Sequence, residues 1–346
     1  MRPLTLKRLF LQCGLLALVL LVVVAVALKL GAVPVSLYGL GRDLLQLVLG
    51  HARALSSDYN MIVIEIRLPR ILLSIVVGAS LAVAGTSFQA LLRNPLADPY
   101  VLGLSSGAAV GAIVALIVEP YLGLPTALAA LFTPIGAFIG AAFTIAAVYF
   151  LGRREGHIDS ATLLLAGIIS ASFLSAIINC LMTTLPGRDV HGMVFWLMGD
   201  LSSSLQPSVR WLLAIGFFAA TGAIYTTASD LNLLLSGEKE AMHLGVDVRR
   251  VQLVVYIAAS ILTGLAVSVS GAIGYVGLLV PHVMRLLFGS DHRVLLPTAA
   301  FGGAIAVVIA DTLARTVVAP SELPVGAMTA LAGAPLFIYL LRRGIA

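Results

Sequence analysis

The sequence predicts an all-α polytopic membrane protein, and three observations support this fold class. Of the 346 residues, 60% are hydrophobic and only 11% are charged, against roughly 45–50% and 25% in ordinary soluble domains. The mean hydropathy is +1.06. The apolar residues fall into ten runs, most of them near the roughly 20 residues that one bilayer crossing needs. We therefore expect a single transmembrane domain over residues 1–346.

The first apolar run, Leu9 to Leu28, follows Arg2, Lys7 and Arg8. A cleaved signal peptide has a shorter apolar core and a small-residue cleavage site, so we expect a retained first helix. Nine further runs are found at residues 71–92, 101–118, 126–150, 162–184, 208–228, 250–269, 276–288, 294–316 and 325–341. This pattern predicts ten crossings. The eighth run is too short for a full span and is expected to be a buried or tilted half-length element.

The distribution of basic residues predicts that both termini are cytoplasmic. With an inner N-terminus, thirteen Lys and Arg residues fall on the inner side and eight on the outer side, in the direction of the positive-inside rule. The net charge of +5 does not indicate nucleic-acid binding, because the basic residues occur singly or in pairs at the ends of apolar runs. We divide the domain into residues 1–70 (first helix and outer segment), 71–228 (helices two to six), 229–249 (cytoplasmic helices) and 250–346 (helices seven to ten).

The segment from Gly271 to Pro297 is apolar but broken by glycines and by Pro281. Backbone groups freed at membrane depth must be satisfied by neighbouring helices or by a water-filled cavity. We expect an outer turn over Gly271 to Tyr275, the short eighth helix over Val276 to Phe288, and a cytoplasmic cap over Gly289 to Arg293. The glycines and the proline are expected to serve close packing.

Four small or cyclic residues recur at a spacing of 186 residues. The pairs are Gly78 and Gly264, Gly85 and Gly271, Pro95 and Pro281, and Gly103 and Gly289. The second and seventh helices run in opposite directions in the predicted topology, so an inverted repeat is one interpretation. The other is coincidence in a chain with 33 glycines.

The longest polar insert on the inner side lies between the sixth and seventh crossings. Ser236 is predicted to cap a helix that starts near Gly237, with Glu238 and Glu240 in the first turn, where the helix dipole favours anions. Gly245 suits the end of that helix. The insert is expected to form a short cytoplasmic helix, a turn and a second short helix, although an ordinary loop is the alternative.

The sequence contains none of the common catalytic or nucleotide-binding motifs. It has no G-x-x-x-x-G-K-[ST] stretch to hold a nucleotide, and no H-E-x-x-H, G-x-S-x-G or Cys/His cluster. Cys13 and Cys180 lie inside apolar runs and are interpreted as small buried side chains. We therefore expect no enzyme activity, no catalytic residue, no metal site and no cofactor in this chain. A partner subunit must hydrolyse any ATP.

Asp311 is the one carboxylate well inside a predicted span, and Arg315 follows it by four residues. This spacing suits an ion pair on one helical face, which we favour over a site for a coupling ion. An ion-driven carrier normally needs ionisable groups at mid-membrane. The near absence of such carboxylates favours an external energy source.

The fifth helix carries Ser172, Ser175, Asn179 and Thr183 at steps of three, four and four residues, which places them on one face. This face is either a wet pathway or a site of hydrogen bonds between helices. The second reading is favoured by spacing alone, because such bonds are common in membranes. Pro186 and Gly187 then break the helix before a short outer element.

Several motifs together resemble the FecCD/BtuC type of ABC importer permease. They are IRLPR (Ile66 to Arg70), NPLADPYVLGLSSGA (Asn94 to Ala108), the segment Gly271 to Pro297, AD..AR (Ala310 to Arg315) and ELPVG....LAGAPLF (Glu322 to Phe337). The resemblance covers nearly the whole chain after residue 60. It implies a type II importer (BtuC-like) fold for cobalamin, haem or iron–siderophore chelates.

The resemblance also implies partners and a location. Two copies of the permease would surround a central pathway as a homodimer in the lipid of a bacterial inner membrane. Two cytoplasmic ATPase subunits would bind ATP and Mg, and a periplasmic binding protein would deliver the cargo. No nucleic acid is implied. The alternatives are a secondary transporter that works alone on a small solute and a channel, for which no selectivity filter or ring of charge is visible.

Particular residues match the positions to which this family assigns roles. Binding-protein docking would use Arg67, Arg70 and Arg315, which would account for basic residues on the outer side. ATPase coupling would use Gly237, Glu238, Glu240, Ala241, Leu244 and Gly245. The cytoplasmic gate would use Asn94 and Leu96 with Ser160 and Ala161, where the second pair departs from the small polar pair of the cobalamin permease. The translocation pathway would be lined by Ser172, Ser175, Asn179, Met182 and Thr183.

Overall fold

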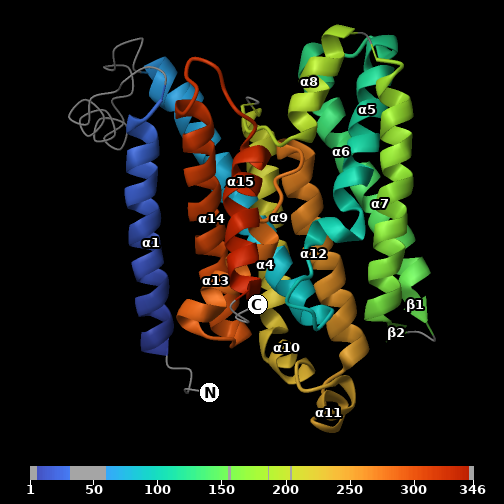
Figure 1. Cartoon of the computed structure of the whole chain (residues 1–346), viewed down its shortest axis with the longest axis vertical. Helices are drawn as coiled ribbons and strands as arrows, with labels where there is room; N and C mark the ends of the chain where they lie inside the picture. The colour runs from blue at the N-terminus through green and yellow to red at the C-terminus, as the bar shows by residue number, and fades with distance from the viewer. Residues whose placement is uncertain (1–5, 32–59, 155–156, 186, 203–204, 343–346) are drawn as a thin grey trace.

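The computed structural model describes residues 6–31, 60–154, 157–185, 187–202 and 205–342, and Figure 1 shows them as a bundle of helices. Eight helices in this part of the chain are long and apolar enough to cross a membrane. They are α1 (Leu6–Lys29), α4 (Leu68–Leu91), α5 (Leu104–Leu122), α6 (Thr126–Gly152), α7 (Ser160–Met182), α9 (Pro207–Thr226), α12 (Val248–Ser270) and α14 (His292–Thr316). The all-α membrane fold predicted from composition is confirmed.

Two further apolar helices are shorter, α13 (Val276–Phe288) and α15 (Val325–Arg342). The bounds of α13 agree with the predicted half-length element. The ten predicted crossings therefore correspond to eight long helices and two short ones, and the count of ten crossings stays a prediction. The third run begins later than predicted, because Gly103, with φ +78°, separates a 3-10 turn, η3 (Pro99–Leu102), from α5.

The remaining elements lie at the two ends of the bundle. One π-helical segment, η2 (Asn60–Arg67), leads into α4, and α8 (Gly187–Leu197) follows α7. The short helices α10 (Ala228–Leu234) and α11 (Glu238–His243) precede α12, and two two-residue strands, β1 (Arg153–Arg154) and β2 (His157–Ile158), pair antiparallel. We call the end with α10 and α11 the inner end and the end with α8 the outer end (Figure 1).

The core of the bundle is built around α4. Its apolar window is 83% buried, and those of α12 and α14 are 72% and 67% buried. Glycines allow α4 and α14 to approach at backbone distance, because a Cβ on Gly78 would meet the Gly303 carbonyl and a Cβ on Gly303 would meet the Gly78 carbonyl. Small residues at such crossings are typical of membrane helices. Any larger side chain at either position would push the two helices apart.

The predicted interruption of α13 by Pro281 is compensated by α4. Pro281 has no N–H, so the Gly277 carbonyl four residues earlier loses its helical partner. The buried Gln89 side chain donates from Nε2 to the carbonyls of Gly277 at 3.4 Å and Leu278 at 3.2 Å. Arg285 in turn donates to Gln89 Oε1 at 2.9 Å. The freed backbone is thus satisfied by a neighbouring helix, as the sequence predicts for this segment.

The recurring residues at a spacing of 186 occupy different local settings. Gly85 lies inside α4 against the Gly277 backbone, whereas Gly271 ends α12 with φ +62°. Pro95 lies in a turn, whereas Pro281 lies inside α13. These two pairs therefore differ in local setting, and the inverted repeat stays a prediction.

Two smaller predictions were wrong. Ser236 does not cap α11, because the N-cap residue is Gly237 and it makes no side-chain capping bond. The Glu240 carboxylate instead lies back against Gly237. Cys180 is exposed on α7 rather than buried, because that helix is at the edge of the bundle. The polar insert does contain two short helices, α10 and α11, and Gly245 with φ +88° follows the second of them.

Candidate functional site

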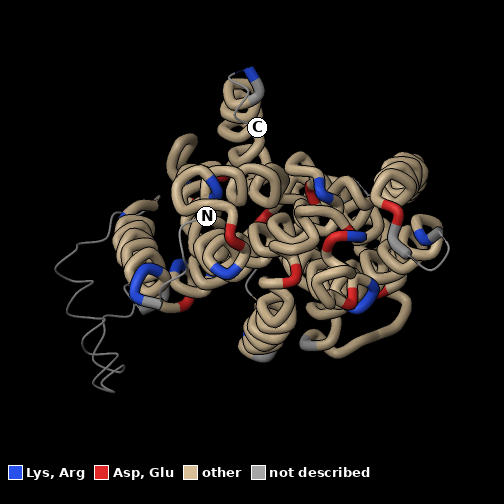
Figure 2. The backbone as a smooth tube through the Cα atoms, turned by 90° about the horizontal axis from the view of Figure 1, so that it is seen from below, with Lys and Arg blue, Asp and Glu red and all other residues tan. Residues whose placement is uncertain are grey.

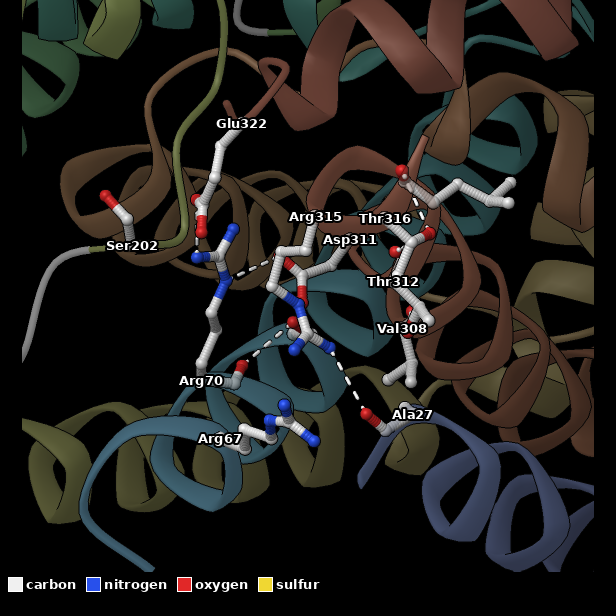
Figure 3. A network of polar contacts seen from close by, with 12 residues as sticks. Ala27, Arg67, Arg70, Ser202, Val308, Asp311, Thr312, Arg315, Thr316 and Glu322 are labelled. Carbon is white, nitrogen blue, oxygen red and sulfur yellow. Dashed lines mark hydrogen bonds and ion pairs between the residues drawn. The ribbon is translucent and has the colours of Figure 1, made fainter. Parts of the chain in front are cut away.

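A cluster of charged side chains joins three helices at the outer end (Figure 3). Asp311 of α14 lies at its centre. Arg70 donates from Nε to Asp311 Oδ1 at 2.7 Å, and Arg315 donates from Nε to Asp311 Oδ2 at 3.1 Å. Arg70 Nη1 also pairs with Glu322 Oε2 at 2.8 Å. The predicted Asp311–Arg315 ion pair is therefore confirmed, and Arg70 extends it to α4.

The same cluster holds the C-terminal end of α1. The last carbonyls of a helix have no partner within it, and arginines supply that partner here. Arg67 Nη1 donates to the carbonyls of Leu28 at 2.7 Å and Lys29 at 3.3 Å. Arg315 Nη2 donates to the Ala27 carbonyl at 3.5 Å. Cations also interact favourably with the negative end of a helix dipole, so α1 is fixed to α4 and α14 at this end.

The structure places the three arginines with a predicted docking role in the interior. Arg67, Arg70 and Arg315 are 5%, 9% and 7% exposed, and their guanidinium groups contact groups of this chain. The accessible member of the cluster is Glu322, whose side chain is 43% exposed. Docking through these arginines stays a prediction, and in this structure they do not form an exposed basic surface.

The polar face of α7 is uncovered in the single chain. Ser172, Ser175, Asn179 and Thr183 are all exposed, and only 11% of the apolar window of α7 is buried. Met182, by contrast, packs partly against the apolar cluster beneath α8. Within the described residues the face is therefore not covered by another helix of the same chain, although Ser172 and Thr183 bond to carbonyls of their own helix.

The predicted gate residues lie on two elements at the inner end. Asn94 and Leu96 follow α4, and Asn94 Oδ1 accepts from the Leu96 N–H at 2.9 Å. Ser160 and Ala161 begin α7, where Asp159 caps the helix by accepting from the Thr162 N–H at 2.8 Å. These bonds fix the local shape of each segment. The contact between η3 and α7 is made further on, where Gly167 lies against the backbone of Val101 and Leu102.

The predicted coupling residues form the short helix α11 and its two ends. Ala241 is fully buried and anchors the helix to the core, whereas Leu244 is 66% exposed. Glu238 pairs with Arg93 at 2.9 Å and accepts from Gln252 Nε2 at 3.4 Å. Sequence spacing did not reveal Arg93, Gln89 or Gln252 as partners, because each contact joins residues on different helices. Pro281 indicated the need for a donor from a neighbouring helix, but not that Gln89 would supply it.

A second polar network joins α10 to the start of α14 at the inner end. Asn232 of α10 donates to Asp291 Oδ1 at 2.8 Å, and Arg293 pairs with Asp291 Oδ2 at 2.7 Å. Hydrogen bonds from Arg293 hold the pKa of Asp291 at about 2, below the usual range. Viewed from the inner end, charged residues of both signs lie near one another (Figure 2). This surface is therefore mixed in charge rather than a uniform basic patch.

In the described residues no group of three or more His, Cys, Asp and Glu side chains could hold a metal ion. The geometry provides a buried ion-pair cluster at the outer end, an uncovered polar face on α7 and two short helices, α10 and α11, at the inner end. Such an arrangement suits movement of a solute across the membrane.

Comparisons with known proteins agree with this reading. The model of the FecCD transport family matches residues 18–343. The hemin transport system permease protein HmuU of Yersinia pestis is 45% identical over 281 residues, which are 81% of this chain and 83% of that protein. The cobalamin import system permease protein BtuC of Halobacterium salinarum is 44% identical over 283 residues, which are 82% of this chain and 74% of that protein.

A solved structure gives the same answer at the level of the fold. An ABC transporter assigned to the metal-chelate type, in an inward-facing conformation, matches with a TM-score of 0.81 and 29% identity. The match covers 96% of this chain and 98% of that one. This chain therefore belongs to the FecCD transport family.

Proposed function

We propose that this chain is the permease subunit of an ABC importer for a metal chelate such as cobalamin, haem or an iron–siderophore. The observation that carries the proposal is the uncovered polar face of α7, where Ser172, Ser175 and Asn179 are exposed on an otherwise apolar helix. Polar side chains on a membrane helix normally face a partner helix or a wet cavity. A second copy of the chain, placed against α7, would enclose such a cavity.

The remaining parts of the importer are assigned by the same proposal. A periplasmic binding protein delivers the chelate at the outer end, and two cytoplasmic ATPase subunits bind at the inner end through α11. ATP binding closes the ATPase dimer, which moves α11 and opens the pathway alternately to each side of the inner membrane. The gate at Asn94 and Leu96 with Ser160 and Ala161 closes the inner side. ATP and Mg stay on the partner subunits.

The buried outer cluster limits how a binding protein docks. Carboxylates of that protein can reach Arg70 only beside or in place of Glu322, because Arg70 is 9% exposed and already pairs with two acidic side chains. The same limit on docking applies to Arg67 and Arg315, since both already bond to carbonyls at the end of α1. Docking at these arginines therefore involves rearrangement of the cluster or contact at its rim.

Reconstitution tests the function directly. The permease is placed in proteoliposomes with its ATPase and binding protein, and uptake of labelled cobalamin, haem and ferric siderophores is measured with and without ATP. We expect uptake of one chelate class only when ATP and the binding protein are both present. Uptake by the permease alone, driven by a proton or sodium gradient, would instead show a secondary transporter.

A pair of variants tests the role of α7. Asn179→Leu is expected to lower chelate uptake while ATP hydrolysis continues, because it removes a polar group from the pathway. Phe173→Leu is the matched control, since Phe173 is 67% exposed on a neighbouring flank of the same helix. Equal uptake by both variants and the unmodified protein would contradict a role of Asn179 in the pathway.

A further inference from the structure

The end of α4 has a conformation that arginine rarely adopts. Arg93 has φ +49°, in the left-handed region where glycine is usual. The Asn94 N–H donates to the Gln89 carbonyl at 3.1 Å, and the Arg93 N–H donates to the Ala90 carbonyl at 3.2 Å. These two bonds are those of a Schellman C-cap. A strained residue at such a position indicates that its side chain is needed for another reason.

The end of α11 shows that the turn itself does not need an arginine. The Val246 N–H donates to the Ala241 carbonyl at 3.0 Å, and the Gly245 N–H donates to the Met242 carbonyl at 3.0 Å. This is the same pair of bonds, and Gly245 occupies the left-handed position with φ +88°. A glycine would therefore complete the C-cap of α4 with less strain than Arg93 does.

The Arg93 side chain connects α4 to the short helix α11. Its Nη2 lies 2.9 Å from Oε1 of Glu238, the first residue of α11. The same oxygen accepts from Gln252 Nε2 of α12 at 3.4 Å. Arg93 and Glu238 are 42% and 26% exposed, and ion pairs this accessible contribute little to stability. Stability alone therefore does not explain the strained backbone.

The same turn of α4 is also connected to α13. Gln89 bonds to the carbonyls of Gly277 and Leu278 and accepts from Arg285. The last turn of α4 thus contacts α11 through Arg93 and α13 through Gln89. The segment that directly follows this turn contains Asn94 and Leu96, the predicted gate residues.

We propose that Arg93 is a positioning residue that transmits movement of α11 to residues 94–98 and, through Gln89, to α13. This inference rests on the proposed function, in which a partner ATPase moves α11. The Arg93–Glu238 pair keeps the start of α11 and the end of α4 at a fixed separation. When α11 moves, the segment that holds Asn94 and Leu96 moves with it.

The decisive variant is Arg93→Gly. It removes the side chain and also relieves the left-handed strain, so the permease is expected to keep or gain thermal stability. In the reconstituted complex, the number of chelate molecules taken up per ATP hydrolysed is expected to fall roughly fivefold or more. Arg249→Ala is the matched control, because Arg249 is exposed on the first turn of α12 and its loss changes the net charge equally. An unchanged uptake per ATP in Arg93→Gly would overturn the proposal.

A second measurement does not depend on transport. A spin label is attached at Leu96→Cys in the permease alone, with Cys13 and Cys180 replaced by serine. Glu238→Gln, which leaves the backbone at residue 93 unaltered, is expected to increase the mobility of the label. Glu240→Gln makes the same change of charge on α11 and is expected to leave the mobility unaltered. Equal mobility in Glu238→Gln and the parent would overturn the link between α11 and this segment.

The two measurements separate the inference from the function on which it rests. If the unmodified complex takes up no chelate, the proposed function fails, and the label mobility still decides whether Arg93 and Glu238 hold the segment. The other case is that the complex transports and Glu238→Gln increases the mobility of the label. Uptake per ATP should then fall in Glu238→Gln, and it should fall no further in the double variant Arg93→Gly/Glu238→Gln. Additive losses would show that the two residues act through separate contacts and would contradict the proposal.

Discussion

The charged side chains at the two ends of the bundle differ in how deeply they are buried. At the outer end, Arg70, Asp311 and Arg315 are at most 9% exposed and bond to one another across α4 and α14. At the inner end, Arg93 and Arg293 are 42% and 40% exposed, and each pairs with a carboxylate near the surface. Breaking a buried pair leaves an uncompensated charge, whereas an exposed pair exchanges easily with water. The charged residues at the outer end therefore stabilise the fold, whereas the ion pairs at the inner end contribute little to its stability.

The largest expected effect is the loss of the central outer carboxylate. Asp311→Ala leaves Arg70 and Arg315 buried beside each other without their shared partner, which costs about 3–5 kcal/mol for a buried pair of this kind. The thermal unfolding temperature of the purified permease in nanodiscs should fall sharply. The triple change Asp311→Leu with Arg70→Met and Arg315→Met should recover much of the loss. A mild effect of Asp311→Ala would show that water reaches the cluster and that the two ends are more alike than the structure indicates.

The second effect concerns the link between α4 and α13. Gln89→Leu leaves the Gly277 carbonyl without a donor, because Pro281 cannot supply one, and an unsatisfied buried group costs about 1–3 kcal/mol. The test is a double-mutant cycle with Pro281→Ala, which restores an N–H at the position four residues after Gly277. Gln89→Leu should cost less in the Pro281→Ala background when unfolding is measured for all four proteins. Equal costs in both backgrounds would mean that Gln89 does not compensate the proline.

Local features of the fold could be predicted from the sequence. The end of α13 follows from Gly289, which directly follows Phe288, and the Asp311–Arg315 pair follows from its spacing of four residues on one helix. Gly245 was predicted to end α11 because glycine suits the left-handed position that follows a helix. In each case the pattern and the contact lie within one turn or one helix. Such contacts depend on backbone periodicity alone.

Contacts between distant parts of the chain could not be predicted in this way. Arg70 and Asp311 are separated by 241 positions, and Arg93 and Glu238 by 145. Their meeting depends on how closely α4 approaches α14 and α11, which glycines such as Gly78 permit but spacing does not reveal. The same reason explains the burial of the outer arginines. Family resemblance predicted where they lie along the chain but not which side chains of this protein they contact.

A smaller effect is expected at the rim of the outer cluster. Glu322→Gln removes one of the two carboxylates on Arg70 but leaves Asp311 in place, and Glu322 is 43% exposed. Its loss should therefore cost about 1 kcal/mol or less, and less again at high salt. Thermal unfolding of the variant in low and high salt measures this difference. A loss as large as that of Asp311→Ala would show that the rim is as essential as the buried centre.

The smallest effect is a dependence on pH at the inner end, before the membrane-spanning part of α14. The Asp291 pKa is held at about 2 by bonds from Arg293 and Asn232, below the value of about 3.9 for a free aspartate. A lowered pKa stabilises the fold above the unfolded value, and that contribution is lost as the pH falls from about 4 through about 2. Asp291→Asn keeps a good capping residue for α14 but removes this titration. The unfolding temperatures of the parent and of Asp291→Asn should therefore differ at pH 6 and converge toward pH 2. A difference that persists unchanged at pH 2 would show that the carboxylate charge is not what stabilises this network.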